Sequence, residues 1–122
     1  VCKPPCAVST PELFSLVRMK RLRFHPRTAE LISALEQGDL EGIAVRLYNV
    51  FEDVLPRRYA QVFEIKGRFL ELGAMAASMT GSGPTVFGLF RDKPLAVQAL
   101  EILRPQFPST FLCELVGRAV YN

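Results

Sequence analysis

The chain has 122 residues, of which 49% are hydrophobic and 22% charged, and its formal net charge is +3. These values are typical of one compact globular domain. They argue against a transmembrane segment, because no apolar run approaches the about 20 residues that cross a bilayer. We also expect no signal peptide, since Lys3, Pro4 and Pro5 interrupt the first apolar residues. Because the first residue is Val1 rather than Met, we expect a piece of a longer protein.

The three cysteines, Cys2, Cys6 and Cys113, are odd in number and lack the spacing of a disulfide framework or a zinc site. We therefore expect reduced thiols in a cytoplasmic protein and no structural metal. Cys113 lies in an apolar run, where we expect a small buried side chain.

Basic residues cluster after the first predicted helix, at Arg18, Lys20, Arg21, Arg23 and Arg27. Such a cluster suits either an anion or nucleic-acid patch or a solvated helix end. Only one aromatic residue, Phe24, lies among the cations. This favours the solvated helix end, and we expect no nucleic-acid partner.

The N-terminal segment, residues 1–8, predicts an edge strand or an extended lead-in, because two prolines interrupt it. Ser9-Thr10-Pro11-Glu12 predicts a helix start, either as a capping box between Ser9 and Glu12 or with Thr10 as the cap. The apolar face of this helix is expected to consist of Leu13, Phe14, Leu16 and Val17.

Three further helices are predicted between residues 26 and 72. The second begins at Pro26 and continues through Gln37, and Gly38 ends it. Asp39 caps the third, whose apolar periodicity continues as far as Val54 before Pro56 stops it. The fourth covers about residues 58–72 and ends at Gly73.

The second half predicts a β-hairpin of residues 74–79 and 85–90, a helix that begins at Pro94, and a last strand over residues 111–120. Helices grouped between strands predict an α+β sandwich, in which helices cover one face of an antiparallel sheet. No linker divides the chain, so we expect residues 1–122 to form one domain.

The hairpin connection, Thr80-Gly81-Ser82-Gly83-Pro84, is unusually rich in glycine. Glycines let successive backbone N–H groups converge on an anion and let a ligand approach the main chain closely. The segment lacks the lysine of a P-loop and does not fit the dinucleotide-binding fingerprint. The residue types alone leave a phosphate-binding loop and a structural tight turn equally open.

Asn49 and Glu52 interrupt an otherwise apolar helical pattern. Because they are three residues apart, they share one helix face, and we expect them to satisfy backbone groups at the domain seam rather than to catalyse a reaction.

Residues 79–90 (MTGSGPTVFGLF) resemble the third conserved motif of the GHMP kinases, which lies in their C-terminal domain. Within that superfamily, Lys3-Pro4-Pro5, Asn49-x-x-Glu52 and Leu72-Gly73-Ala74 resemble the 4-diphosphocytidyl-2-C-methyl-D-erythritol kinases. The resemblance covers essentially all of residues 1–122. It implies a ferredoxin-like GHMP kinase C-terminal domain.

The resemblance also implies an activity and a set of substrate-binding residues. The full-length enzyme would phosphorylate the 2-hydroxyl of 4-diphosphocytidyl-2-C-methyl-D-erythritol with ATP and Mg²⁺, in non-mevalonate isoprenoid biosynthesis. Thr10 and Phe14 would line the cytidine pocket, and Gly81, Ser82 and Gly83 would approach the diphosphate or the transferring phosphate. The residue pattern keeps the alternative that Thr10 is a helix cap and Phe14 a core residue.

The ATP-binding N-terminal domain and its Gly-Leu-Gly-Ser-Ser loop are absent from this chain. We therefore expect no catalytic residue, no cofactor bound by this domain alone and no kinase activity from it. Its expected partners are the small-molecule substrate and the missing N-terminal domain, with no membrane. Two alternatives remain: the C-terminal domain of another GHMP kinase, acting on homoserine, mevalonate or a sugar, and a stand-alone ferredoxin-like binding module.

Overall fold

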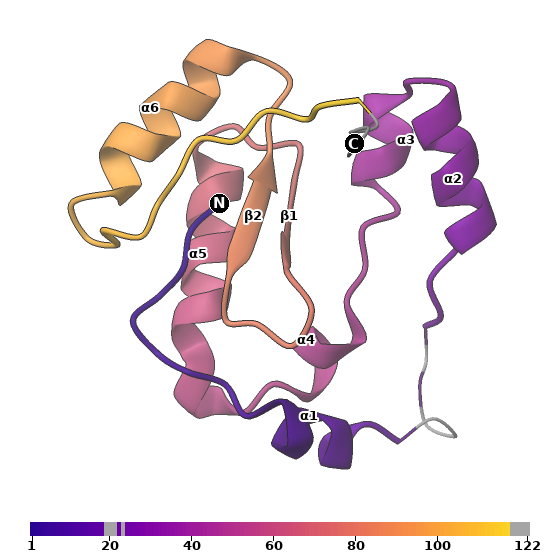
Figure 1. Cartoon of the computed structure of the whole chain (residues 1–122), viewed down its shortest axis with the longest axis vertical. Helices are drawn as coiled ribbons and strands as arrows, with labels where there is room; N and C mark the ends of the chain where they lie inside the picture. The colour runs from indigo at the N-terminus through magenta and orange to yellow at the C-terminus, as the bar shows by residue number, and fades with distance from the viewer. Residues whose placement is uncertain (19–21, 23, 118–122) are drawn as a thin grey trace, which may run out of the picture.

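The computed structural model describes residues 1–18, 22 and 24–117 (Figure 1). Its helices are α1 (Thr10–Leu16), α2 (Thr28–Glu36), α3 (Leu40–Ala44), α4 (Val50–Val54), the 3₁₀ turn η2 (Arg57–Tyr59), α5 (Ala60–Glu71) and α6 (Lys93–Leu103). Its strands are β1 (Ala76–Met79) and β2 (Val86–Leu89). Within the described ranges, no helix is long and apolar enough to cross a membrane.

The sheet is built on the antiparallel hairpin of β1 and β2, in which Ala76 pairs with Leu89 and Met79 with Val86. Cys2 extends this hairpin, because it forms antiparallel bridges with both Val86 and Thr110. The lateral order is therefore β1, β2, the N-terminal segment and the segment around Thr110. This order, with helices between the strands, confirms the predicted α+β, ferredoxin-like architecture.

Helix α5 packs against both strands of the hairpin and forms the centre of the core (Figure 1). The core side chains are apolar and almost fully buried: Cys2, Leu13, Val62, Ile65, Phe69, Met79, Val86, Leu103 and Phe107. Gly88 lets the helix come close to β2, because a β-carbon at this position would lie 2.7 Å from Cγ of Phe69. The hairpin is thereby held rigidly against α5.

Local signals place most helix ends correctly. Gly38 (φ +65°) and Gly73 (φ +99°) follow α2 and α5 in the left-handed conformation that ends helices. The predicted third helix is wrong in its extent, because the chain leaves the helix after Ala44 and begins a new one at Val50. Asn49 causes the restart: its backbone is extended and its Oδ1 accepts a hydrogen bond from the backbone N–H of Phe51 at 3.0 Å.

The predicted apolar face of the first helix is also wrong in part. Leu13 is fully buried, but Phe14 is 63% exposed and Leu16 is 42% exposed. Helix α1 has only 7 residues, and the backbone is extended again at Val17. So short a helix presents one residue to the core and leaves the neighbouring apolar side chains in solvent.

The predicted last strand is not present over residues 111–117, and residues 118–120 lie outside the described part. Thr110 lies opposite Cys2, and the backbone N–H of Phe111 donates to the carbonyl of Val1 at 2.8 Å. Cys113 is exposed rather than buried. Of the basic cluster, Lys20, Arg21 and Arg23 likewise lie outside the described residues.

Candidate functional site

The glycine loop, residues 80–85, joins β1 to β2 in a tight, hydrogen-bonded turn. The N–H of Thr80 donates to the carbonyl of Thr85, and the N–H of Gly83 donates to the carbonyl of Thr80, both at 2.8 Å. Gly81 (φ +47°) and Gly83 (φ +77°) adopt left-handed conformations. A β-carbon at Gly83 would also lie 2.5 Å from the sulfur of Met79. Both glycines are therefore required by the backbone, as the sequence pattern predicted.

Two successive backbone donors lie at the tip of the glycine loop. The N–H groups of Gly81 and Ser82 donate to no acceptor among the described residues, whereas those of Thr80 and Gly83 are satisfied within the loop. Gly81 is exposed, and a β-carbon on it would meet no atom within 4 Å. Free N–H groups in consecutive peptides at an accessible glycine turn are suited to binding an anion such as a phosphate.

Thr10 lies directly against the glycine loop. Its Oγ1 is 2.7 Å from Oγ of Ser82, a hydrogen bond between residues 72 positions apart in the sequence. The alternative that Thr10 caps the helix is wrong, because Ser9 is the N-cap and its Oγ accepts from the N–H of Glu12 at 3.4 Å. The hydroxyl of Thr10 is therefore available to the site, and the two predicted substrate-binding segments meet here.

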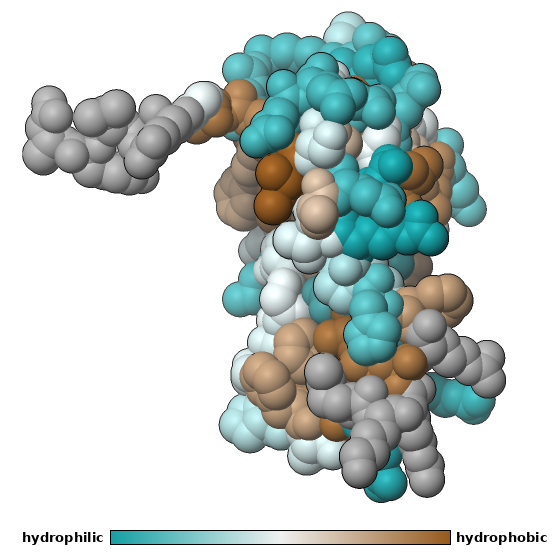
Figure 2. Space-filling view, turned by 90° about the vertical axis from the view of Figure 1, so that its right-hand side faces the viewer, coloured by the Kyte–Doolittle hydropathy of each residue, from teal (hydrophilic) through white to brown (hydrophobic). Residues whose placement is uncertain are grey.

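Phe14 lies one turn further along α1 and is a surface residue, so the alternative of a core role does not hold. Its ring packs edge-on against Phe51 of α4, with centroids 5.0 Å apart and planes at 82°. Figure 2 shows apolar surface at the lower end of the molecule, where α1 and α4 lie in Figure 1. An exposed ring held by a second ring offers a flat apolar face to a ligand.

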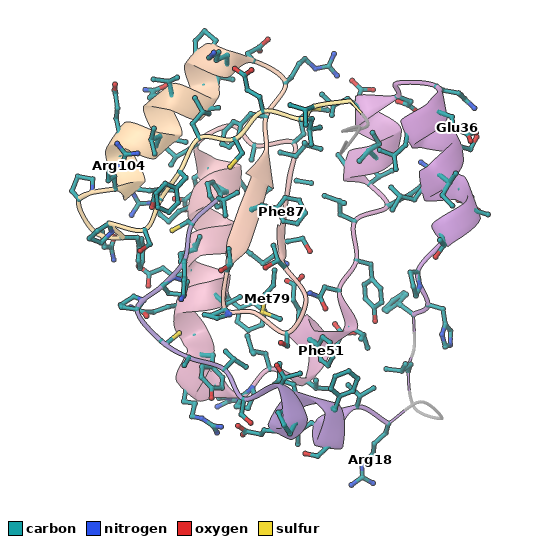
Figure 3. All side chains as sticks on the ribbon, in the orientation of Figure 1. Arg18, Glu36, Phe51, Met79, Phe87 and Arg104 are labelled. Carbon is teal, nitrogen blue, oxygen red and sulfur yellow. The ribbon has the colours of Figure 1, made fainter. Side chains whose placement is uncertain are left out.

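Asn49 and Glu52 hold the base of the glycine loop, where Figure 3 shows Met79 and Phe51. Nδ2 of Asn49 donates to the carbonyls of Met79 and Gly81, each at 2.7 Å. Oε2 of Glu52 accepts from Oγ of Ser78 at 3.1 Å and from the N–H of Met79 at 3.3 Å. The expectation that both residues satisfy backbone groups is confirmed. That the backbone is the glycine loop itself could not be read from the sequence, because 30 residues separate Asn49 from Met79.

Lys66 on α5 completes this cluster through an ion pair with Oε1 of Glu52. The carboxylate side chain is only 10% exposed, so it is well shielded from water. Burying a charge of this kind costs free energy unless the charge is paired and hydrogen-bonded. Lys66, Ser78 and Met79 supply the pairing and the hydrogen bonds, and α4 is thereby attached to both β1 and α5.

A cavity of about 480 Å³ lies beside the glycine loop, between α2, the segment before α4 and the sheet. Asn49, Thr80, Gly81 and Phe87 line it on the sheet side (Phe87 is labelled in Figure 3), and Arg27 and Arg46 on the other. No local pattern in the sequence indicates this cavity, because its walls come from segments far apart in the chain. Both arginines pair with Glu30, at 3.5 Å and 3.2 Å.

Tyr48 also lines this cavity, and its hydroxyl donates to Oδ2 of Asp53 at 2.6 Å. This hydrogen bond, with smaller contributions from burial and from the negative charge of Asp53, raises the pKa of Tyr48 to about 12. The phenol is therefore a neutral hydrogen-bond donor at physiological pH. Over the described ranges, no three His, Cys, Asp or Glu side chains converge into a metal-binding group.

The relatives of this chain are kinases. Two proteins named 4-diphosphocytidyl-2-C-methyl-D-erythritol kinase match it, one from Clostridium botulinum (strain Langeland) and one from Alkaliphilus metalliredigens. The first is 34% identical over 114 residues, which is 93% of this chain and 41% of the relative. The second is 36% identical over 122 residues, which is 100% of this chain and 42% of the relative. The chain thus spans about two fifths of the length of the curated relatives it matches.

A solved structure is similar over most of the chain. It is a crystal structure of 4-(cytidine 5'-diphospho)-2C-methyl-D-erythritol kinase, with a TM-score of 0.68 and 28% sequence identity. The match covers 85% of this chain and 37% of the solved one. The family described as GHMP kinases C terminal matches residues 31–109, more than half of the chain, including the glycine loop. The chain therefore belongs to the GHMP kinase C-terminal domain family.

Proposed function

We propose that this chain is the substrate-side domain of an ATP-dependent kinase that phosphorylates the 2-hydroxyl of 4-diphosphocytidyl-2-C-methyl-D-erythritol, a reaction of non-mevalonate isoprenoid biosynthesis. The names of its relatives support this substrate. The observation that carries the proposal is the hydrogen bond between Thr10 and Ser82. It joins the segment proposed to bind the cytidine to the loop proposed to bind the diphosphate.

The proposed role of Phe14 is to stack on the pyrimidine, and Thr10 lies beside the same nucleotide. Stacking of a base on an aromatic side chain is worth about 1–3 kcal/mol, and a ring that is 63% exposed is accessible for it. Within the glycine loop, the segment Gly81-Ser82-Gly83 is proposed to approach the diphosphate, and the backbone N–H groups of Gly81 and Ser82 are the donors for it. An aromatic face and an anion site on one surface fit a cytidine diphosphate group.

We propose that ATP and Mg²⁺ are bound with the help of the part of such a kinase that this chain does not span. Phosphoryl transfer depends mainly on the positioning of the reactants and on the neutralisation of negative charge around the γ-phosphoryl. The metal ion supplies this neutralisation when it is bound. The residues described above bind and orient the acceptor substrate. We therefore propose that this chain alone is inactive as a kinase and that the complete enzyme acts in the cytoplasm, in keeping with its free cysteines.

The test is a binding measurement by titration calorimetry on the complete natural protein that contains this chain. Cytidine diphosphate should bind more tightly than mevalonate or homoserine. Phe14→Ala should weaken cytidine diphosphate binding about tenfold, in line with a stacking energy of about 1–3 kcal/mol. Phe63→Ala is the matched control, since Phe63 is an exposed residue of α5 that does not line the cavity beside the glycine loop, and it should leave the affinity unchanged.

Each alternative function predicts a different outcome of this binding measurement. Tighter binding of mevalonate or homoserine would identify a different GHMP kinase. An equal loss in both phenylalanine variants would remove Phe14 from the site. A complete protein that neither binds these compounds nor transfers phosphate from ATP would leave the stand-alone binding module.

A further inference from the structure

We infer that Asn49 is a positioning residue for diphosphate recognition, because it orients the Gly81–Ser82 peptide so that its N–H group faces the ligand. This inference rests on the proposed function and adds a residue to it. Asn49 would not touch the substrate. It would act through the backbone of the glycine loop, and its contribution is separable from its role as a helix cap.

The side-chain amide of Asn49 is fully used. Its Oδ1 accepts from the backbone N–H of Phe51 at 3.0 Å and caps α4. Its Nδ2 makes two hydrogen bonds of 2.7 Å, to the carbonyls of Met79 and Gly81, which lie on either side of Thr80. An amide has two N–H donors, and both are spent on the loop. The three contacts together determine the orientation of the side chain, and a carboxylate of the same shape cannot make the last two.

The bond to Gly81 has a consequence for Ser82. The carbonyl of Gly81 and the N–H of Ser82 belong to one planar trans peptide, in which C=O and N–H point in opposite directions. By binding the carbonyl, Asn49 turns the N–H of Ser82 away from itself. That N–H is one of the two loop donors with no acceptor among the residues the structure describes. The amide therefore selects the orientation in which the free donor is presented outward.

The end of β1, which Asn49 binds, is itself held in place by the α4 segment. Both the carbonyl and the N–H of Met79, the last residue of β1, bind side chains of the α4 segment: the first binds Asn49 at 2.7 Å and the second binds Glu52 at 3.3 Å. These side chains take the place of a neighbouring strand at the end of β1. Lys66 of α5 in turn pairs with Glu52. A rigid support is what a positioning residue requires.

The decisive variant is Asn49→Asp. Aspartate is as good a helix N-cap as asparagine, so the start of α4 is retained. It has no donor when ionised, so the contacts with Met79 and Gly81 are replaced by repulsion between oxygens. The matched control is Asp39→Asn, the reverse exchange at the N-cap of α3, where Oδ1 of Asp39 accepts from Gly42 at 3.0 Å.

The measurement is the ratio of the dissociation constants for cytidine and cytidine diphosphate, in the complete natural protein. This ratio reports what the diphosphate adds to binding, and a change in the folded fraction affects both constants equally. We expect Asn49→Asp to lower the ratio at least tenfold with the cytidine constant nearly unchanged, and Asp39→Asn to leave both unchanged. Asn49→Ser keeps a capping hydroxyl and leaves the carbonyls to water, so it should give a smaller decrease and serves if the aspartate variant does not fold.

An unchanged ratio in the Asn49 variants, with a wild-type protein that prefers cytidine diphosphate, would overturn the role of Asn49 and leave the proposed function standing. A wild-type ratio near one would overturn the proposed function and this inference with it. An equal loss of both affinities would show that Asn49 is structural only.

Discussion

Gly88 provides a direct test of the packing that holds the glycine loop against α5. In a Gly88→Ala variant, the new β-carbon would lie 2.7 and 2.8 Å from two ring atoms of Phe69 and 3.1 Å from the ring of Phe90. Carbon atoms in contact are normally about 3.5–4.0 Å apart, so β2 and α5 would have to separate by nearly 1 Å. Phe69 is only 3% exposed, so its ring could yield only by a shift within the packed core.

The expected loss of stability follows from these contacts. Overpacking of a well-packed core costs about 1–3 kcal/mol. Replacing glycine also reduces the freedom of the unfolded chain, which offsets about 0.4–1 kcal/mol. The net destabilisation should be about 1–2 kcal/mol. Gly67→Ala is the control: Gly67 lies exposed within α5, a β-carbon added there would meet no atom within 4 Å, and alanine should stabilise by about 0.5–1 kcal/mol.

The assay is urea unfolding of the three proteins, followed by circular dichroism. With a denaturant dependence of about 2 kcal/mol per molar urea, the midpoints of the two variants should differ by about 1 M, on opposite sides of the wild-type midpoint. A Gly88→Ala protein that unfolds at the same urea concentration as wild type, or above it, would refute the close approach of Phe69 to β2.

Two further predictions concern single side chains. Because the hydrogen bond to Asp53 raises the pKa of Tyr48 to about 12, absorbance titration should show one tyrosine ionising near pH 12, and near its ordinary value of about 10 in Asp53→Ala. The stabilisation by this bond is fully present below about pH 10 and lost as the pH rises towards 12; an identical titration of both proteins would contradict the contact. Burial raises the pKa of the Cys2 thiol, whereas Cys113 is exposed, so a thiol reagent should modify Cys113 rapidly and Cys2 only on unfolding. Equal rates would mean that Cys2 does not lie between Val86 and Thr110.

Short-range signals in the sequence were sufficient for several helix ends and for the hairpin. Gly38 and Gly73 end their helices, Asp39 begins α3, and the loop of residues 80–85 connects two strands. Each of these features depends on residues within one turn of one another. The physical reason is that caps and turns satisfy local backbone groups and need no distant partner.

The residue types left an anion-binding loop and a structural turn equally open, and a motif resemblance indicated the kinase family. The residue pattern also left Thr10 and Phe14 ambiguous. A threonine at a helix start satisfies the rules for a cap, and a phenylalanine in an apolar run satisfies those for a core residue. The structure decides both cases: Ser9 already caps the helix, and α1 is too short to bury Phe14.

The tertiary structure alone decided how the site is assembled. Periodicity favoured one helix through residue 54, yet the chain breaks before Asn49, because its side chain binds the carbonyls of Met79 and Gly81. Thr10 meets Ser82 because the N-terminal segment pairs with β2 at Cys2 and delivers α1 beside the glycine loop. Contacts between residues tens of positions apart depend on the packing of whole elements, and no local pattern in the sequence encodes them.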